Sequence, residues 1–200
     1  MSGQMIGKRL HTRFSFFLNS GAFLEPSVNP VSDRLAQPLI LSPGIATVQA
    51  GSYSWTEYQL RGMSDPSKPL SISSLVTAGG LWTGTQRTVG VTAVIRPSHR
   101  LRLSIGGSRT AANLGAPDTD FVSAVWTMRV NYSFTTNMFL DSLVQYDQDR
   151  SRVNANLRFN LIHHPLSDLF IVYNEQQIRN DPDVRPGRSV IVKVTRMMAF

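Results

Sequence analysis

Apolar and polar residues alternate at every second position through most of the 200-residue chain. The clearest alternation lies at 152–163, where one parity is apolar (Val153, Ala155, Leu157, Phe159, Leu161) and the other is polar or basic (Asn154, Asn156, Arg158, Asn160). A β-strand points successive side chains to opposite faces. The pattern therefore predicts strands with one apolar and one polar face, and no convincing helix interrupts them.

The alternation predicts about ten strands, most of them about 9–13 residues long, where soluble proteins usually have about 5–6. Such lengths suit strands that cross a bilayer at a tilt. The expected strands are 9–18, 53–62, 70–79, 86–97, 100–110, 120–133, 138–148, 152–163, 168–178 and 188–199.

The connections between these strands alternate in length. Tight turns are expected at 97–99, 135–137 and 165–167, and longer segments at 111–119, 147–152 and 180–187. Outer-membrane barrels have short periplasmic turns and longer extracellular loops. If the C-terminus is periplasmic, the tight turns all fall on the periplasmic side. Counting strands back towards the N-terminus places the connection at 63–69 on the same side. Residues 19–52 then form a long outer loop rich in Pro and Gly, unusual in a compact domain.

These patterns predict an all-β fold: an antiparallel up-and-down transmembrane β-barrel, with about ten strands here that form part of a larger barrel. Residues 1–52 would hold the first strand and the long loop, and residues 53–200 the barrel strands. The last strand alternates towards a terminal aromatic residue and resembles the assembly signal of outer-membrane barrels, although Arg196 interrupts it; the signal residues are Val192, Val194, Met198 and Phe200.

Composition narrows the choice of protein class. Only 16% of residues are charged, and no apolar run is long enough for a membrane-spanning helix, which fits transmembrane strands but also a soluble β-sandwich. The absence of cysteine excludes disulfide and thiolate metal sites. Residues 1–20 lack the apolar core and cleavage site of a secretory signal. Either the chain is a fragment of a longer exported precursor, which we favour, or Met1 is not the true start.

The net charge of +7 comes mostly from Arg scattered along the strands. Without a basic run, this charge argues against nucleic-acid binding. Arginine suits a water-filled lumen or the phosphates of a lipopolysaccharide surface.

The expected inner face carries the candidate site residues. We expect Glu175 to face the lumen and to pair with Arg158 on the neighbouring strand, either as a structural ion pair or as part of a pore constriction. The polar or charged lumen residues are Arg129, Asn154, Asn156, Arg158, Asn160, Asn174, Glu175 and Lys193.

Other candidate chemistry is weak. His163 and His164 are adjacent in a strand, so they point to opposite faces beside a turn and cannot share a metal. Asp147 and Asp149 could hold calcium, but the glycine and distal glutamate of a helix-loop-helix site are missing, which favours a solvated turn. No G-x-S-x-G element is present, so we expect neither catalysis nor a cofactor.

Aromatic residues lie mostly near the expected strand ends, as in the girdles of membrane barrels, although a sandwich core would also hold them. They are Tyr53, Trp55, Tyr58, Trp82, Trp126, Tyr132, Tyr146 and Tyr173.

From about Ser42 onward the sequence resembles a bacterial family with an N-terminal module similar to family-9 carbohydrate-binding domains and a C-terminal β-barrel domain of unknown function. His164-Pro165-Leu166 stands where the family usually has Arg-Pro-Gly, which implies a different turn. The segments that carry the resemblance are Gly51-Ser52-Tyr53-Ser54-Trp55-Thr56, Gly79-Gly80-Leu81-Trp82-Thr83-Gly84, Leu143-Val144-Gln145-Tyr146, Asn156-Leu157-Arg158-Phe159, His163 through Glu175, and Arg188-Ser189-Val190-Ile191-Val192-Lys193.

The resemblance implies an outer-membrane barrel that anchors a larger surface protein or forms its pore. Carbohydrate binding or uptake would depend on the module, which this sequence lacks. Expected partners are outer-membrane lipid, lipopolysaccharide and the barrel-assembly machinery. Two alternatives stay open: a soluble β-sandwich binding module and an outer-membrane hydrolase.

Overall fold

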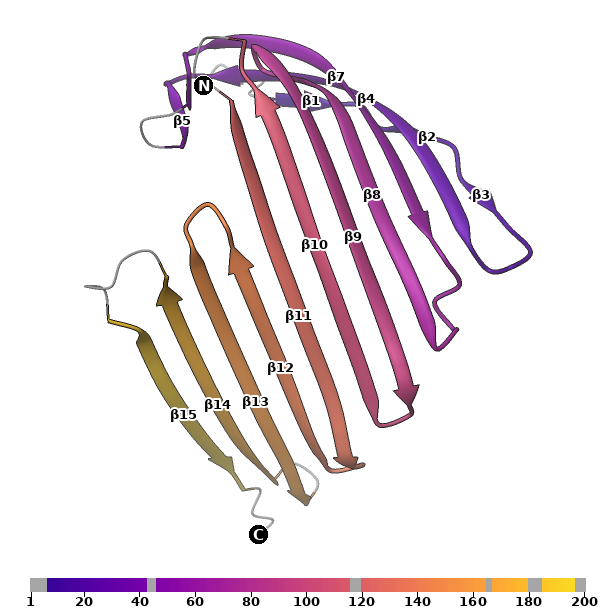
Figure 1. Ribbon diagram of the computed structural model, residues 1–200, viewed down its shortest axis with the longest axis vertical. Coiled ribbons are helices and arrows are strands. Elements are labelled where there is room, and N and C mark those ends of the chain that lie inside the picture. The colour runs from indigo at the N-terminus through magenta and orange to yellow at the C-terminus, as the bar shows by residue number, and fades with distance from the viewer. Residues whose placement is uncertain (1–6, 43–45, 116–119, 165–166, 180–184, 197–200) are drawn as a thin grey trace. The chain divides into compact units, whose positions relative to one another are not determined.

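The computed structural model describes residues 7–42, 46–115, 120–164, 167–179 and 185–196, and its regular structure is all β-strand. One antiparallel up-and-down sheet holds 13 strands, and from β7 to β15 each strand pairs with the next in the chain (Figure 1). This confirms the predicted all-β, up-and-down antiparallel arrangement. No helix in the described part is long and apolar enough to span a membrane.

The nine strands predicted from residue 53 onward are all present, with bounds that shift by a few residues. They are β7 (Gly51–Met63), β8 (Leu70–Leu81), β9 (Gly84–Ser98), β10 (Leu101–Asn113), β11 (Phe121–Thr135), β12 (Met138–Asp147), β13 (Arg152–His164), β14 (Ser167–Ile178) and β15 (Gly187–Thr195).

The sheet is not closed as a barrel. Within the described residues β15 pairs only with β14, and the first three short strands pair only with β4 (Phe23–Leu35). Closure requires hydrogen bonds between the first and last strands of a sheet. Within this chain the strands therefore form an open sheet, and their place in a larger barrel stays a prediction.

The chain divides into two compact units. Unit 1 comprises Met1–Pro66, Ile72–Val91 and Ser108–Ser123. Unit 2 comprises Ser67–Ser71, Thr92–Gly107 and Ala124–Phe200. Strands β8 to β11 contribute residues to both units.

In unit 1, the expected long loop at 19–52 is wrong for residues 23–35, which form β4 and pair with β7 along its full length. Pro26 and Pro30 had favoured a loop, because proline cannot donate to a strand ladder. Their carbonyl oxygens accept hydrogen bonds from Phe14 N (3.1 Å) and Leu10 N (3.0 Å), so both prolines turn their backbone groups away from β7. The prolines therefore remove no hydrogen bond from the ladder between β4 and β7.

The same prolines explain why the strand expected at 9–18 is broken. It appears as β1 (Gly7–Arg9), β2 (Thr12–Arg13) and β3 (Phe16–Phe17), which all pair with β4 in one continuous register. The breaks fall at Leu10 and Phe14, whose partners in that register are the two prolines. A missing N–H at each proline removes one hydrogen bond from the ladder.

A small apolar core joins the connections of unit 1. The hairpin of β5 (Leu39–Ser42) and β6 (Ala46–Val48) ends in Val48, which is buried with Leu114. Thr83 Oγ1 donates to the Leu114 carbonyl at 2.7 Å, which ties the β8–β9 turn to the same loop. The residues packed around this core are Leu35, Tyr53, Leu81, Trp82 and Phe121.

In unit 2, the register from β11 to β15 sorts side chains onto two faces, because directly paired residues project to the same side. The first, here named the apolar face, carries Trp126, Met128, Val130, Leu140, Val144, Leu157, Phe159, Ile171, Val190, Val192 and Val194. The second, named the polar face, carries Arg129, Gln145, Asn154, Asn156, Arg158, Asn160, Asn174, Gln176 and Lys193.

The connection lengths follow the predicted alternation only in part. Tight turns join β9 to β10 and β11 to β12, as expected. However, Trp82 and Thr83 alone join β8 to β9, on the side assigned to longer loops. The predicted turn at 165–166 and parts of the loops at 111–119 and 180–187 lie outside the described residues.

Close packing fixes Trp126 on the apolar face. A Cβ atom placed on Gly107 of β10 would overlap the indole ring of Trp126, so the ring lies directly over the glycine. Such coverage of a strand glycine by an aromatic side chain offsets the packing that the missing side chain cannot supply.

We predict that Gly107→Ala lowers the free energy of unfolding by about 1–3 kcal/mol, because the added methyl group must displace Trp126. Urea unfolding followed by circular dichroism measures the loss. Gly187→Ala is the control, since a Cβ there would meet no described atom within 4 Å. An equal cost for Gly107→Ala in a Trp126→Ala background would show that the two residues are not coupled.

Candidate functional site

The polar face of unit 2 brings together seven of the eight expected lumen residues. Arg129 lies on β11, and β13 supplies four side chains at every second position. Strands β14 and β15 add one residue each. The residues on this face are Arg129, Asn154, Asn156, Arg158, Asn160, Asn174 and Lys193. Their proximity follows from the period of two in the sequence, whereas their role stays a prediction.

Amide side chains form a hydrogen-bonded chain across three strands of this face. Asn156 Nδ2 donates to Asn174 Oδ1 at 2.5 Å, and Asn174 Nδ2 donates to Ser189 Oγ at 3.1 Å. Cross-strand pairing places these residues side by side. A neutral network of this kind fixes side-chain orientation without burying charge.

A hollow of about 450 Å³ lies over these amides. We name the polar-face side chains that line it the amide groove: Gln145, Asn154, Asn156, Asn174, Gln176 and Ser189. Leu143 is also on this face, while the lining residues Ala155, Glu175 and Arg188 have the opposite parity. The volume is in the range typical of small-molecule sites.

Four cations lie on the polar face outside the amide groove: Arg129, Arg152, Arg158 and Lys193. The Arg158 guanidinium lies 5.2 Å from the centroid of the Phe170 ring, a cation–π arrangement. Asp141 is directly opposite Arg158 in the register, but Asn131 Nδ2 donates to its carboxylate at 2.5 Å. Neither Arg129 nor Lys193 forms an ion pair with a described carboxylate. Outside the groove the polar face therefore carries both signs of charge, because Asp141, Asp147 and Asp168 share it with these cations.

The expected lumen-facing position of Glu175 is wrong. This residue is on the apolar-face side and not on the polar face, so it does not pair with Arg158. Its Oε1 accepts hydrogen bonds from Arg188 Nε (3.0 Å) and Nη2 (2.9 Å), and its Oε2 accepts one from Tyr173 at 2.8 Å. The directly opposed arginine on β15 satisfies the carboxylate, which removes the reason to expect a lumen position. The parity shared with Leu169, Ile171 and Tyr173 could have revealed this placement.

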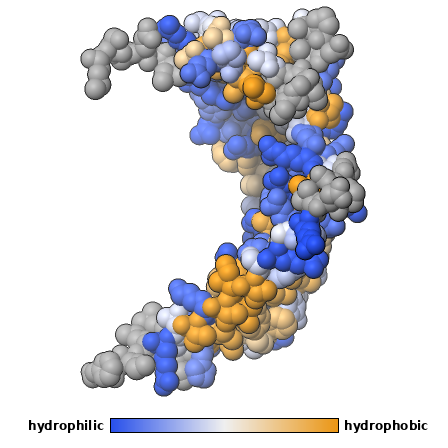
Figure 2. All heavy atoms as spheres, turned by 90° about the vertical axis from the view of Figure 1, so that its left-hand side faces the viewer, coloured by the Kyte–Doolittle hydropathy of each residue, from blue (hydrophilic) through white to orange (hydrophobic). Residues whose placement is uncertain are grey.

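The expected C-terminal signal is described only in part. Val192 and Val194 are exposed on the apolar face of β15. Figure 2 shows an apolar patch on the surface in the lower half of the view. Met198 and Phe200 lie outside the described residues. The signal stays a prediction.

A second polar cluster lies in unit 1 and was not predicted from the sequence. Glu57 is 7% exposed and accepts a hydrogen bond from Arg9 Nη2 at 2.6 Å, with Trp55 Nε1 and Gln86 Nε2 each at 3.4 Å. Asn29, directly opposite Glu57, is fully buried and lies against His11 at 2.5 Å. The cluster unites residues far apart in sequence. Its only signal was the shared parity of Tyr53, Trp55 and Glu57.

The Trp82 side of this cluster is conformationally strained. Trp82 has a φ of 47°, a left-handed conformation that bulky residues rarely adopt. Its Nε1 donates to Asp33 Oδ2 at 3.1 Å, and its ring lies 6.1 Å from that of Trp55. These contacts hold the turn in place.

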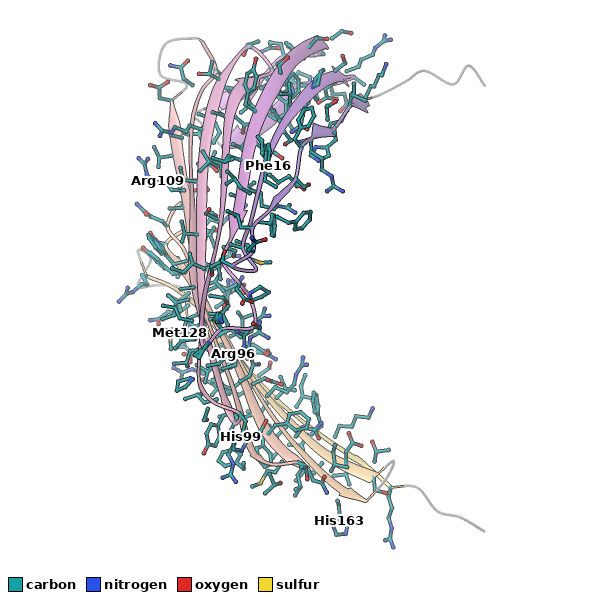
Figure 3. All side chains as sticks on the ribbon, turned by 90° about the vertical axis from the view of Figure 1, so that its right-hand side faces the viewer. Phe16, Arg96, His99, Arg109, Met128 and His163 are labelled. Carbon is teal, nitrogen blue, oxygen red and sulfur yellow. The ribbon has the colours of Figure 1, made fainter. Side chains whose placement is uncertain are left out.

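The histidines and the acidic turn have ordinary surroundings. His99 and His163 lie at strand ends in different hairpins (Figure 3). Asp147 Oδ1 accepts a hydrogen bond from the Arg150 backbone N–H at 3.2 Å, so this carboxylate closes its own turn. No group of three or more His, Cys, Asp or Glu residues in the described ranges could hold a metal ion.

Comparisons with protein-family models, with curated proteins and with solved structures each found no match. The resemblance to the bacterial barrel family therefore stays a prediction from the quoted segments.

We predict that Glu57→Leu destabilises the protein by about 2 kcal/mol, because Arg9, Trp55 and Gln86 lose their buried acceptor. The value is discounted from the usual cost of about 3–5 kcal/mol since Arg9 is half exposed. Chemical unfolding measures it. Asp149→Leu, in an exposed turn, is the control and should change little. An equal effect of both variants would contradict a specific role for the cluster.

Proposed function

We propose that this chain forms part of the wall of an outer-membrane β-barrel, and that it anchors a larger surface protein or lines its pore. The single observation that carries the proposal is a reversal of the usual burial pattern. Large apolar side chains are exposed, while several of the most buried side chains are polar.

Examples in each unit illustrate the reversal. In unit 2, Trp126 is 56% exposed and Val192 is 60% exposed on the apolar face. In unit 1, Tyr58 and Leu60 of β7 are exposed, whereas Asn29 is fully buried. A water-soluble protein rarely leaves an extended apolar face uncovered. A membrane barrel requires it, because lipid contacts the outside and water or polar groups occupy the inside.

The dimensions of the apolar face agree with a bilayer. From Val153 to Leu161, β13 keeps this alternation over eight residue steps, which at about 3.3 Å each span about 26 Å along the strand. Transmembrane barrel strands tilt by about 35–45°, so this segment rises about 20 Å within an apolar band about 25 Å tall. Met128 projects from this face of the sheet (Figure 3).

Aromatic residues lie towards both ends of the apolar face. Trp126 pairs in register with Tyr146, near the β11–β12 strand ends that are remote from their tight turn. Tyr132 and Phe134 lie towards that turn, with ring centroids 4.7 Å apart. Two such bands are the arrangement of interfacial girdles.

In this proposal the polar face of unit 2 faces the barrel interior. Lipid and lipopolysaccharide would contact the apolar face, and the barrel-assembly machinery would insert the protein. The carbohydrate-binding role of the family's N-terminal module, which the resemblance implies, would belong to a further module. The unpaired edge of β15 would join another strand, since open edges are not tolerated in lipid.

We expect the chain to refold only with detergent or lipid, and to migrate differently on gels when cold and when boiled. In a variant with Trp55→Phe and Trp82→Phe, the fluorescence of the remaining Trp126 should be quenched by brominated lipids, because it lies on the lipid-facing side at one membrane interface. A monodisperse β-rich protein without detergent, whose Trp126 is insensitive to brominated lipid, would overturn the membrane proposal and favour a soluble β-sandwich.

Neighbouring substitutions on β13 provide a matched test of which face meets lipid. Leu157→Arg should cost about 2–4 kcal/mol in folding into lipid bilayers, because the cation would enter hydrocarbon. Asn156→Arg should be tolerated, since it faces the opposite side. Both stabilities are measured by urea titration in the same vesicles. A larger loss of stability for Asn156→Arg than for Leu157→Arg would show that the faces are assigned incorrectly.

A further inference from the structure

We propose that the amide groove of unit 2 binds an uncharged, polyhydroxylated ligand, such as a neutral oligosaccharide or a polyol. This ligand class rests on the proposed lumen-facing role of the polar face and gives that role a chemical specificity. Three features of the groove support it: the alignment of its amides, their free hydrogen-bonding capacity and their neutrality.

The amides are aligned in two neighbouring rows that run across the strands. Gln145, Asn154 and Gln176 are consecutive cross-strand partners on β12, β13 and β14. The next row on the same face contains Asn156, Asn174 and Ser189. Neighbouring strands are about 4.8 Å apart, so each row offers hydrogen-bonding groups at a regular spacing.

The two rows differ in how many of their hydrogen-bonding groups are available to a ligand. Asn156, Asn174 and Ser189 bond to one another, which holds the second row in place. The side chains of Gln145, Asn154 and Gln176 form no hydrogen bond with another described residue. Each free amide offers two N–H donors and a carbonyl acceptor to a ligand in the hollow. The second row thus orients the site, and the first row is open for recognition.

The groove is also neutral. No ionised side chain belongs to these two rows from β12 to β15 on the polar face. Glu175 and Arg188 border the hollow, but both lie on the apolar-face side. They neutralise each other in an ion pair in which two guanidinium nitrogens donate to one carboxylate oxygen. A charged ligand would find no counter-charge within these two rows from β12 to β15 and would have to reach Arg129, Arg152 or Arg158 beside them.

Hydroxyl groups match this surface best. A hydroxyl both donates and accepts, as an amide does, so a run of hydroxyls can satisfy both kinds of group in each amide. An apolar ligand would leave the free amides unpaired, which costs binding energy. The hollow of about 450 Å³ is large enough for a small ligand.

Isothermal titration calorimetry with maltohexaose tests the proposal, using the full chain refolded in a zwitterionic detergent without a sugar headgroup. We expect saturable binding. Asn154→Leu and Gln176→Leu should each weaken it at least about fivefold, the loss for one hydrogen bond. Gln177→Leu is the matched control and should bind normally, because Gln177 is paired with Val153 on the other face.

The outcomes separate this inference from the membrane proposal. If folded, heat-modifiable protein does not bind maltohexaose, or prefers an anionic oligogalacturonate or a neutral peptide, the ligand class is wrong while the barrel proposal stands. If Asn154→Leu and Gln176→Leu both fold and bind normally, the groove is not the site. If the chain is monodisperse without detergent, the membrane proposal fails, and the same titrations in buffer decide for or against the groove.

Discussion

The antiparallel hydrogen-bond ladder is the constraint on which the other features of this protein depend. Cross-strand partners project to the same face, so a single register carries the alternation of one strand to the next. From β11 to β15 this keeps Leu157 level with Tyr173 and Val190, and Asn156 level with Asn174 and Ser189. A slip by one residue would mix the faces and dismantle both the apolar face and the amide groove.

The hydrogen bonds between polar side chains on neighbouring strands follow from the same geometry. Side chains on the polar face bond across strands because their backbone partners already hold them at a fixed spacing. The chain from Asn156 through Asn174 to Ser189 does so with neutral groups in unit 2, whereas Glu57 and Arg9 use charge in unit 1. The neutral arrangement leaves neighbouring amides available to a ligand, whereas the charged arrangement mainly fastens one strand to another.

The sequence was informative wherever the period of two was unbroken. It located all the strands from β7 onward and the residues that share the polar face of unit 2. It failed at β4, because Pro26 and Pro30 suggest a loop unless the outward direction of their backbone groups is known. It also misplaced Glu175, because a general expectation about charge was preferred to the parity of its own strand. The cluster around Glu57 depends on the pairing of distant strands, which alternation alone does not specify.

The prolines of β4 also give the N-terminal strand an unusual kind of attachment. Its backbone ladder lacks one hydrogen bond at each proline, and side chains add further contacts: Arg9 to Glu57 at 2.6 Å, Arg13 to Glu25 at 3.5 Å, and Ser15 to Glu25 at 2.6 Å. Electrostatic contacts with exposed arginines weaken as salt screens them, whereas backbone ladders respond little to salt. Added salt therefore weakens the attachment of both edges of the sheet, through Arg9 and Arg13 at one edge and Arg188 at the other, while the backbone ladder between β4 and β7 is little affected.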